Sequence, residues 1–145
     1  MKILYTDDIT SPIYSDAVAI RKTVFVEEQG VPLSLEIDEN EAVCIHFVLY
    51  DEHNQATATC RILPEPGREK VILQRMAVLE AHRGRQLGKV LLEAAIDFAK
   101  QQNYLLIELH AQISARGFYE KMGFEPFGEV FEEAGITHVH MRMAL

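Results

Sequence analysis

The chain has 145 residues, of which 48% are hydrophobic and 25% are charged, the ordinary balance of one globular domain that buries a core. Its 22 acidic and 14 basic residues give a formal charge of −8 at pH 7, which argues against a protein that binds nucleic acid through a basic face. No apolar run approaches the roughly 20 residues of a membrane-spanning helix, so we expect no membrane insertion.

The first third of the chain predicts a strand, a helix and a loop. Residues 2–6 have the composition of a short strand. Ser11-Pro12 is a favourable helix start, and apolar residues then recur at helical spacing until Gly30-Val31-Pro32 ends the helix. Residues 33–42 are acidic and have no clean period, which predicts a loop.

The rest of the chain alternates strands and helices. Three strands are predicted over residues 43–51, 55–65 and 70–78, and a clear amphipathic stripe predicts a helix that starts near Leu87 and ends near residue 101. A buried strand, a short helix and two further strands follow, over residues 104–111, 114–123, 124–133 and 136–144. A strand, a helix and a strand in succession require at least one parallel pair. We therefore expect one mixed α/β domain over residues 1–145.

The long helix begins with two glycines and three basic residues, and such a helix start binds anions readily. It is not a P-loop, because Gly84 and Gly88 are separated by three residues instead of four and Lys89 is followed by Val90 instead of a hydroxyl residue. It also lacks the glycine spacing of a dinucleotide-binding turn.

The turn resembles the acetyl-CoA signature of the GNAT acetyltransferase superfamily, Gln/Arg-x-x-Gly-x-Gly/Ala. It runs from Arg83 to Gly88, and its central glycine is replaced by Gln86. A second GNAT-like pattern follows at residues 111–124, with Gln112 where asparagine is usual and with the aromatic and glycine positions occupied as the pattern requires. Residues 24–32 and 132–141 further resemble a bacterial subgroup of predicted GNAT acyltransferases.

The resemblance implies that acetyl-CoA is the cosubstrate. His138 and His140 form a His-x-His pair that could bind a metal, but no third ligand is evident nearby in the sequence, so we expect no metal. The pyrophosphate would lie on the loop N–H groups, the pantetheine arm along the strand around residues 76–78, and the thioester oxygen would accept a bond from a main-chain N–H there, an interaction worth about 3 kcal/mol. The residues that it assigns to the cofactor are Met76, Ala77, Val78, Arg83, Gly84, Arg85, Gln86, Leu87, Gly88, Lys89, Gln112, Phe118 and Tyr119.

The resemblance also implies roles in acetyl transfer to an amine. Tyr119 stands where GNAT enzymes commonly place a tyrosine next to the cofactor sulfur, as the acid for the departing thiolate; the alternative is a residue that only packs the helix on the sheet. His138 is the first candidate for the general base, since imidazole titrates near neutral pH; the alternative is a strand histidine with one structural hydrogen bond. Its neighbour His140 should face the same side of the strand.

The acceptor pocket of such folds usually lies near the end of the first helix. We expect Glu27, Glu28 and Gln29 to bind the acceptor amine there, with Glu28 as the second candidate base, and Asp38 to join them. Acids in the last turn of a helix oppose its dipole, which a functional site would explain. The other acids of residues 36–41 are expected to be solvated, and His110 has either a structural or a substrate role.

The sequence therefore predicts an N-acetyltransferase that acetylates a primary amine of a small molecule or peptide in one direct step. Cys44 and Cys60 lie outside the site-forming segments and have no disulfide or metal spacing, which favours buried thiols, a cytoplasmic location and no covalent intermediate. By analogy with such folds, the last strands or the first helix could form a homodimer interface. Two alternatives stay open: a non-catalytic module of the same fold that binds or senses CoA, favoured by Gln86, and an interaction protein whose last strands and acidic loop bind a partner.

Overall fold

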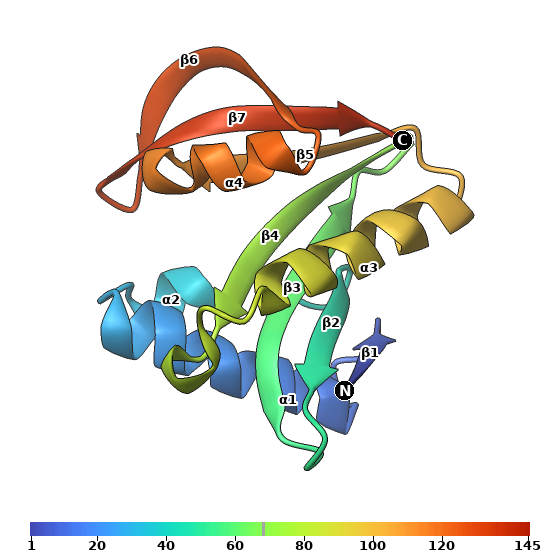
Figure 1. Cartoon of the computed structure of the whole chain (residues 1–145), viewed down its shortest axis with the longest axis vertical. Helices are drawn as coiled ribbons and strands as arrows, with labels where there is room; N and C mark the ends of the chain where they lie inside the picture. The colour runs from blue at the N-terminus through green and yellow to red at the C-terminus, as the bar shows by residue number, and fades with distance from the viewer. Residues whose placement is uncertain (68) are drawn as a thin grey trace.

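In residues 1–67 and 69–145, which the computed structural model describes, seven strands form one mixed sheet in the order β1-β2-β3-β4-β5-β7-β6 (Figure 1). The β4 and β5 strands are parallel, and the other neighbouring strands are antiparallel. The predicted mixed α/β class is confirmed.

The elements are β1 (Lys2–Thr6), α1 (Pro12–Arg21), the π-helix η1 (Lys22–Glu28), α2 (Leu33–Glu36), β2 (Ile45–Tyr50), β3 (Ala56–Pro64), β4 (Lys70–Val78), the 3₁₀ turn η2 (Glu80–His82), α3 (Leu87–Gln101), β5 (Leu106–Gln112), the 3₁₀ turn η3 (Ile113–Ala115), α4 (Arg116–Lys121), β6 (Glu125–Glu133) and β7 (Ile136–Ala144).

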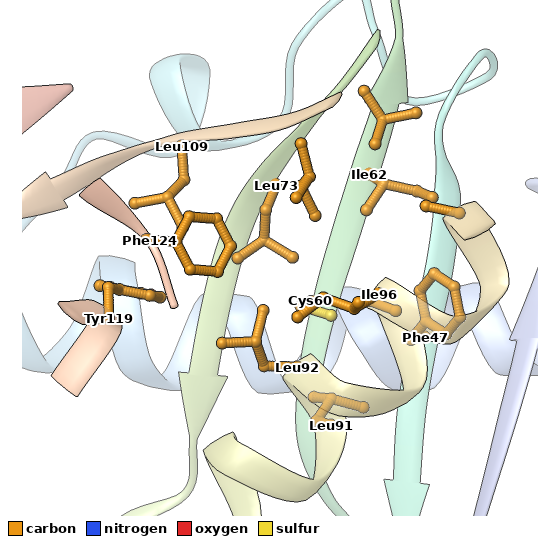
Figure 2. Close-up of a cluster of buried hydrophobic side chains, with 14 of the residues drawn as sticks. Phe47, Cys60, Ile62, Leu73, Leu91, Leu92, Ile96, Leu109, Tyr119 and Phe124 are labelled. Carbon is orange, nitrogen blue, oxygen red and sulfur yellow. The ribbon is translucent and has the colours of Figure 1, made fainter. Parts of the chain in front are cut away.

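Helices cover both faces of the β2–β4 part of the sheet, with α1 on one side and α3 on the other (Figure 1). Successive side chains of β2 point to opposite faces of the sheet. Phe47 and Leu49 pack in the cluster with α3, whereas Val48 and Tyr50 pack in the cluster with α1. A strand that is buried on both faces has a continuous apolar sequence, as residues 45–50 do. The larger cluster continues under β5 and α4, where Figure 2 shows its edge at Tyr119 and Phe124.

The first helical segment begins at Pro12 and ends before Gly30, as the sequence predicts, but only Pro12–Arg21 is α-helical. Ser11 accepts a hydrogen bond from the backbone N–H of Ile13 at 3.1 Å, and Pro12 occupies the first helical position. From Lys22 onward the helix widens into the π-helix η1, and Gly30 follows it with a φ of +74°. Such wide turns are rare and occur often at functional sites. None of the described helices is long and apolar enough to cross a membrane.

The acidic segment of residues 33–42 differs from the prediction of a solvated loop. It begins with the short helix α2, and Glu36 and Glu41 are 3% and 6% exposed. The reason is that two buried arginines from distant elements face it. Arg21 Nε lies 2.8 Å from Glu36 Oε2, and Arg21 Nη1 lies 2.7 Å from Glu41 Oε1. Arg61 Nη1 lies 2.8 Å from Glu41 Oε2.

This buried ion network joins α1, β3 and the acidic segment, and Asp38 belongs to it. Its carboxylate lies 2.8 Å from Arg61 Nη2, and its backbone N–H donates to Glu41 at 3.0 Å. Burial by itself would raise the pKa of Glu41, but the hydrogen bonds from Arg21 and Asp38 and the charges of both arginines outweigh it and hold the pKa far below its ordinary value. Glu41 is therefore ionised in the folded protein at neutral pH.

We expect Glu41→Gln to lower the free energy of unfolding at neutral pH by about 3 kcal/mol, because it leaves two buried guanidinium groups without their shared partner. The contribution of Glu41 is complete above the ordinary pKa of a glutamate and is lost as the pH falls toward the depressed value of the folded state. The difference between wild type and variant should therefore shrink in acid. Urea denaturation over a pH series measures it.

The matched control is Glu39→Gln, which removes an exposed carboxylate from the same segment. It should change the free energy of unfolding by less than about 0.5 kcal/mol. A difference between wild type and Glu41→Gln that stays constant from neutral pH into acid would contradict the depressed pKa.

Candidate active site

The β4 and β5 strands pair at four positions only, Lys70–Leu73 with Leu106–Leu109, and then part. Beyond this point β5 continues along β7, while β4 stays with β3, so the two halves of the sheet diverge as a wedge (Figure 1). Within the described residues, the edge of β4 from Gln74 to Val78 that faces the wedge forms no ladder with β5. Apart from the carbonyl of Val78, which accepts a hydrogen bond from Arg83 Nε at 2.9 Å, its backbone N–H and C=O groups on that side are available to a ligand.

A bulge in β4 lies where the strands part. Between the pairs Thr59–Ala77 and Arg61–Gln74, β3 has one residue and β4 has two, Arg75 and Met76. Arg75 takes a left-handed φ of +59°, a conformation that usually requires glycine. A bulge bends its strand and increases its twist, which turns the end of β4 away from β5.

The side chain of Arg75 fixes the opposite wall of the wedge. Its Nε lies 3.0 Å from Glu36 Oε2, and its Nη2 lies 3.2 Å from Asp38 Oδ2. The same Nη2 donates to the backbone carbonyls of Leu35 and Glu36, both at 3.3 Å. One strained residue thus opens the sheet and attaches α2 to it.

A cavity of about 610 Å³ occupies the wedge. Residues of η1 and α2 form one wall, β4 and β5 form the base, and the start of α4 with the β6–β7 turn forms the other side. The predicted site residues that line it are Gln29, Met76, His110, Gln112, Phe118, Tyr119 and His138. The fold therefore brings together residues that are more than 100 positions apart in the sequence.

Tyr119 lies between the core and this cavity. Its side chain is 9% exposed and packs against Phe118 and Phe124, with ring centroids 5.0 and 5.8 Å away. Burial, with a smaller contribution from the nearby Cys60 thiol, raises the pKa of Tyr119 to about 12. The hydroxyl keeps its proton at neutral pH and is able to donate a hydrogen bond to a group in the cavity.

His138 is buried and lines the same cavity. Its Nδ1 lies 2.7 Å from the backbone carbonyl oxygen of Ile136. Because a carbonyl oxygen only accepts, Nδ1 carries the hydrogen, and in the neutral ring Nε2 carries the free lone pair. That tautomer is the one a general base needs. Stacking on Phe131, with centroids 5.8 Å apart, also holds the ring, and His140 stacks on the same phenyl ring at 4.4 Å, as expected for neighbours on one face.

A second hollow, of about 150 Å³, lies at the start of α3. No side-chain cap satisfies the first N–H groups of this helix among the described residues, so they are available to an anion. Phe118 borders both this hollow and the large cavity. The predicted cofactor residues that line the second hollow are Val78, Arg83, Gly84, Gln86, Leu87, Gly88, Lys89 and Phe118.

Gln86 departs from the GNAT pattern in residue type but not in backbone conformation. It takes the left-handed conformation, with φ +60° and ψ 26°, which glycine adopts without strain. A Cβ on Gly88 would touch only a methyl group of Val78, at 4.0 Å, so nothing inside the described protein requires glycine there. The free space above Gly88 is thus open to a ligand.

Five of the predicted site residues line neither hollow, namely Glu27, Glu28, Asp38, Ala77 and Arg85. Glu28 instead lies 2.7 Å from Arg83 Nη2, and Arg83 Nε donates to the carbonyl of Val78 at 2.9 Å. These contacts join the end of η1 to the α3 loop. Asp38 acts in the buried ion network.

Three charged residues of the cavity were not assigned a role in the sequence analysis: Glu36, Arg75 and Glu133. Glu133 lies in the stretch of residues 132–141 that carries the subgroup resemblance, so a signal for it existed. Nothing local marked Glu36 or Arg75. Within the described residues, no group of three or more His, Cys, Asp or Glu side chains has the geometry to hold a metal ion.

Known proteins resemble this chain in sequence and in fold. The family model described as acetyltransferase (GNAT) domain matches residues 20–145. A relative from Bacillus subtilis (strain 168), whose name assigns it provisionally to the acetyltransferases, is 40% identical over 129 residues, which cover 86% of this chain and 85% of the relative. An acyl-CoA N-acyltransferase from Pseudomonas aeruginosa superposes with a TM-score of 0.87 at 27% identity, covering 99% of this chain and 100% of that one. Escherichia coli ElaA superposes with a TM-score of 0.85 at 27% identity, covering 98% and 99%.

The left-handed backbone at the bulge predicts how two Arg75 variants differ in stability. Arg75→Ala and Arg75→Gly remove the same ion pairs, but glycine takes the left-handed conformation without the Cβ penalty of about 1 kcal/mol. The glycine variant should therefore be the more stable of the two by about 1 kcal/mol, whereas glycine in a strand is ordinarily the less stable. Chemical denaturation measures both.

The matched control is the neighbouring Gln74, which is not among the residues with positive φ. There the ordinary order should hold, with Gln74→Ala more stable than Gln74→Gly. The same order at both positions would show that the left-handed conformation of Arg75 is not held in solution.

Proposed function

We propose, since the chain belongs to the GNAT acetyltransferase family, that it transfers the acetyl group of acetyl-CoA to a primary amine of a small molecule or peptide. Two hollows that share Phe118 carry this proposal. One is an anion site at the start of a helix, and the other is a cavity that contains both a protonated tyrosine and a histidine in the tautomer of a base. A cosubstrate with a pyrophosphate at one end and a thioester at the other fits both.

Backbone groups of α3 and β4 would make most of the contacts with acetyl-CoA. Its pyrophosphate would accept hydrogen bonds from the first N–H groups of α3, where the helix dipole and Lys89 favour negative charge. The pantetheine arm would lie along the free edge of β4, beyond the last pair with β5. The thioester oxygen would then face the N–H groups around Met76–Val78, as a preorganised donor for the developing oxyanion.

The chemistry needs one base and one acid. His138 Nε2 would take a proton from the acceptor ammonium, directly or through water, and the neutral amine would attack the thioester carbonyl carbon. The tetrahedral intermediate then collapses and the C–S bond breaks, while the nitrogen loses its second proton to give the neutral amide. The Tyr119 hydroxyl donates a hydrogen bond to the departing thiolate and passes it a proton, which the proton lost by the nitrogen replaces. A direct transfer is favoured over a covalent intermediate, because Cys44 and Cys60 do not line the cavity and burial raises the pKa of both thiols.

Acetyl-CoA binding is tested at Gly88. Gly88→Ala should stabilise the free protein by about 0.5 kcal/mol, because alanine is the better helix residue and the Cβ meets no close neighbour. The same Cβ would occupy the space above the α3 start, so acetyl-CoA affinity, measured by calorimetric titration, should fall by about ten-fold or more.

The matched control is Gly117→Ala in α4. A Cβ on Gly117 meets no atom within 4 Å, and Gly117 lines neither hollow. It should leave acetyl-CoA affinity unchanged. Equal affinity of wild type and Gly88→Ala would contradict the placement of the pyrophosphate, and no binding to the folded wild type would overturn the proposal.

Catalysis is tested at Tyr119 and His138 with a thiol-release assay on a panel of amines. Each of Tyr119→Phe and His138→Ala should lower kcat on the order of a hundred-fold, with acetyl-CoA affinity retained. Because the pKa of Tyr119 is raised to about 12, its hydroxyl stays protonated across the alkaline range of the assay, so Tyr119→Phe should lower the pH profile without changing its shape.

These outcomes separate the enzyme from the CoA-binding module. Full turnover in both variants would exclude their proposed roles. Tight acetyl-CoA binding with no acetylation of any amine by the wild type would support the non-catalytic module instead.

A further inference from the structure

Two carboxylates line the large cavity, and they differ in whether a positively charged side chain of the protein pairs with them. Glu36 is buried, with Arg21 Nε at 2.8 Å and Arg75 Nε at 3.0 Å from its Oε2. Its charge is therefore compensated by two guanidinium groups. Glu133, the last residue of β6, has no arginine or lysine within ion-pair distance among the described residues.

The contact that Glu133 does make leaves most of its capacity free. Its Oε2 lies 3.2 Å from Nδ1 of His110, which also lines the cavity. A carboxylate accepts about four hydrogen bonds, so one imidazole leaves room for a further donor. The side chain is 47% exposed, which places it at the rim of the cavity and within reach of a molecule that enters it.

Glu133 and the candidate base lie on the same face of the β6–β7 hairpin. His138 pairs with Phe131, and Glu133 is two residues beyond Phe131 on the same strand. They are thus diagonal neighbours, with backbone positions about 7–8 Å apart. A short acceptor whose amine approaches His138 would bring its other end to Glu133.

The charges that face Glu133 leave its carboxylate ionised. The hydrogen bond from His110 lowers its pKa, burial opposes this in part, and the positive charge of Arg75 lowers it further. Arg75 does not compete for it, because its guanidinium lies 3.0 Å from Glu36 and 3.2 Å from Asp38.

We propose that Glu133 is a specificity-determining residue that binds a second, cationic group of the acceptor, so that the preferred acceptors are short diamines or amines that carry a further ammonium or guanidinium group. This inference rests on the proposed acetyl transfer and narrows its substrate class. The preference arises at the rim, where the carboxylate compensates the second charge while the first amine reacts inside the cavity.

The test uses three acceptors of nearly equal length: cadaverine, hexylamine and 6-aminohexanoate. They present a cationic, an apolar and an anionic group, respectively, at the end opposite the reacting amine. The wild type should acetylate cadaverine with a kcat/KM about ten-fold above that for hexylamine, and 6-aminohexanoate least well. Glu133→Gln should reduce the ratio of cadaverine to hexylamine to about one, and Glu133→Lys should invert the order of cadaverine and 6-aminohexanoate.

The matched control is Glu132→Gln, which removes the same charge from the adjacent position of the same strand. Glu132 does not line the cavity, and its side chain points to the other face. It should keep the preference of the wild type. A wild type that uses cadaverine and hexylamine equally, or equal losses of the preference in the Glu132 and Glu133 variants, would overturn the role of Glu133 while the proposed acetyl transfer stands.

A binding measurement separates the two proposals. Calorimetric titration of the CoA-saturated protein with cadaverine should give an affinity that Glu133→Gln lowers about ten-fold and Glu132→Gln leaves unchanged. This result without any turnover would support the cationic subsite and count against the transferase. Absence of cadaverine binding to the folded, CoA-saturated wild type would overturn the subsite.

Discussion

The parting of β4 from β5 after four paired residues is the constraint on which the site depends. A sheet ordinarily satisfies its backbone groups along the whole length of each strand, and here one edge of β4 is left without a partner strand. The bulge at Arg75 contributes to this separation through its left-handed backbone and at the same time anchors α2. The cavity, the free edge and the approach from the start of α3 all follow from it.

One wall of the wedge, formed by η1 and α2, is fixed by ion pairs with arginines that lie behind it and outside the cavity. Arg21 and Arg61 are almost fully buried, and they bind the carboxylates of the acidic segment so that α1, β3 and α2 keep one arrangement. Buried ion pairs add little net stability compared with apolar packing, but a single broken member is costly. We infer that this network serves mainly to select one conformation of the wall.

Some polar groups of the cavity are paired with each other, and others are free to interact with a ligand. Glu36 and Arg75 neutralise each other within the wall, whereas Tyr119 keeps its proton, His138 presents a free nitrogen and Glu133 keeps charge at the rim. Proton donor, proton acceptor and fixed charge therefore lie in one cavity and are positioned by three different elements. The proposed reaction and the proposed acceptor preference use only these groups.

The sequence by itself determined what local spacing encodes: the apolar stripe of α3, the order of the elements along the chain and the glycine-containing helix start. The resemblance to the GNAT pattern pointed to Tyr119 and His138 as candidates for one site. The tertiary structure alone decided which charges meet. Glu36 and Glu41 were expected in solvent because their segment is acidic and has no clean period, and Glu28 was expected in the acceptor pocket because it ends the first helix. Their arginine partners lie 15 to 55 positions away in the sequence, so local spacing could not reveal them. Periodicity reports the face of an element, whereas ion pairs and the separation of strands depend on how distant elements pack.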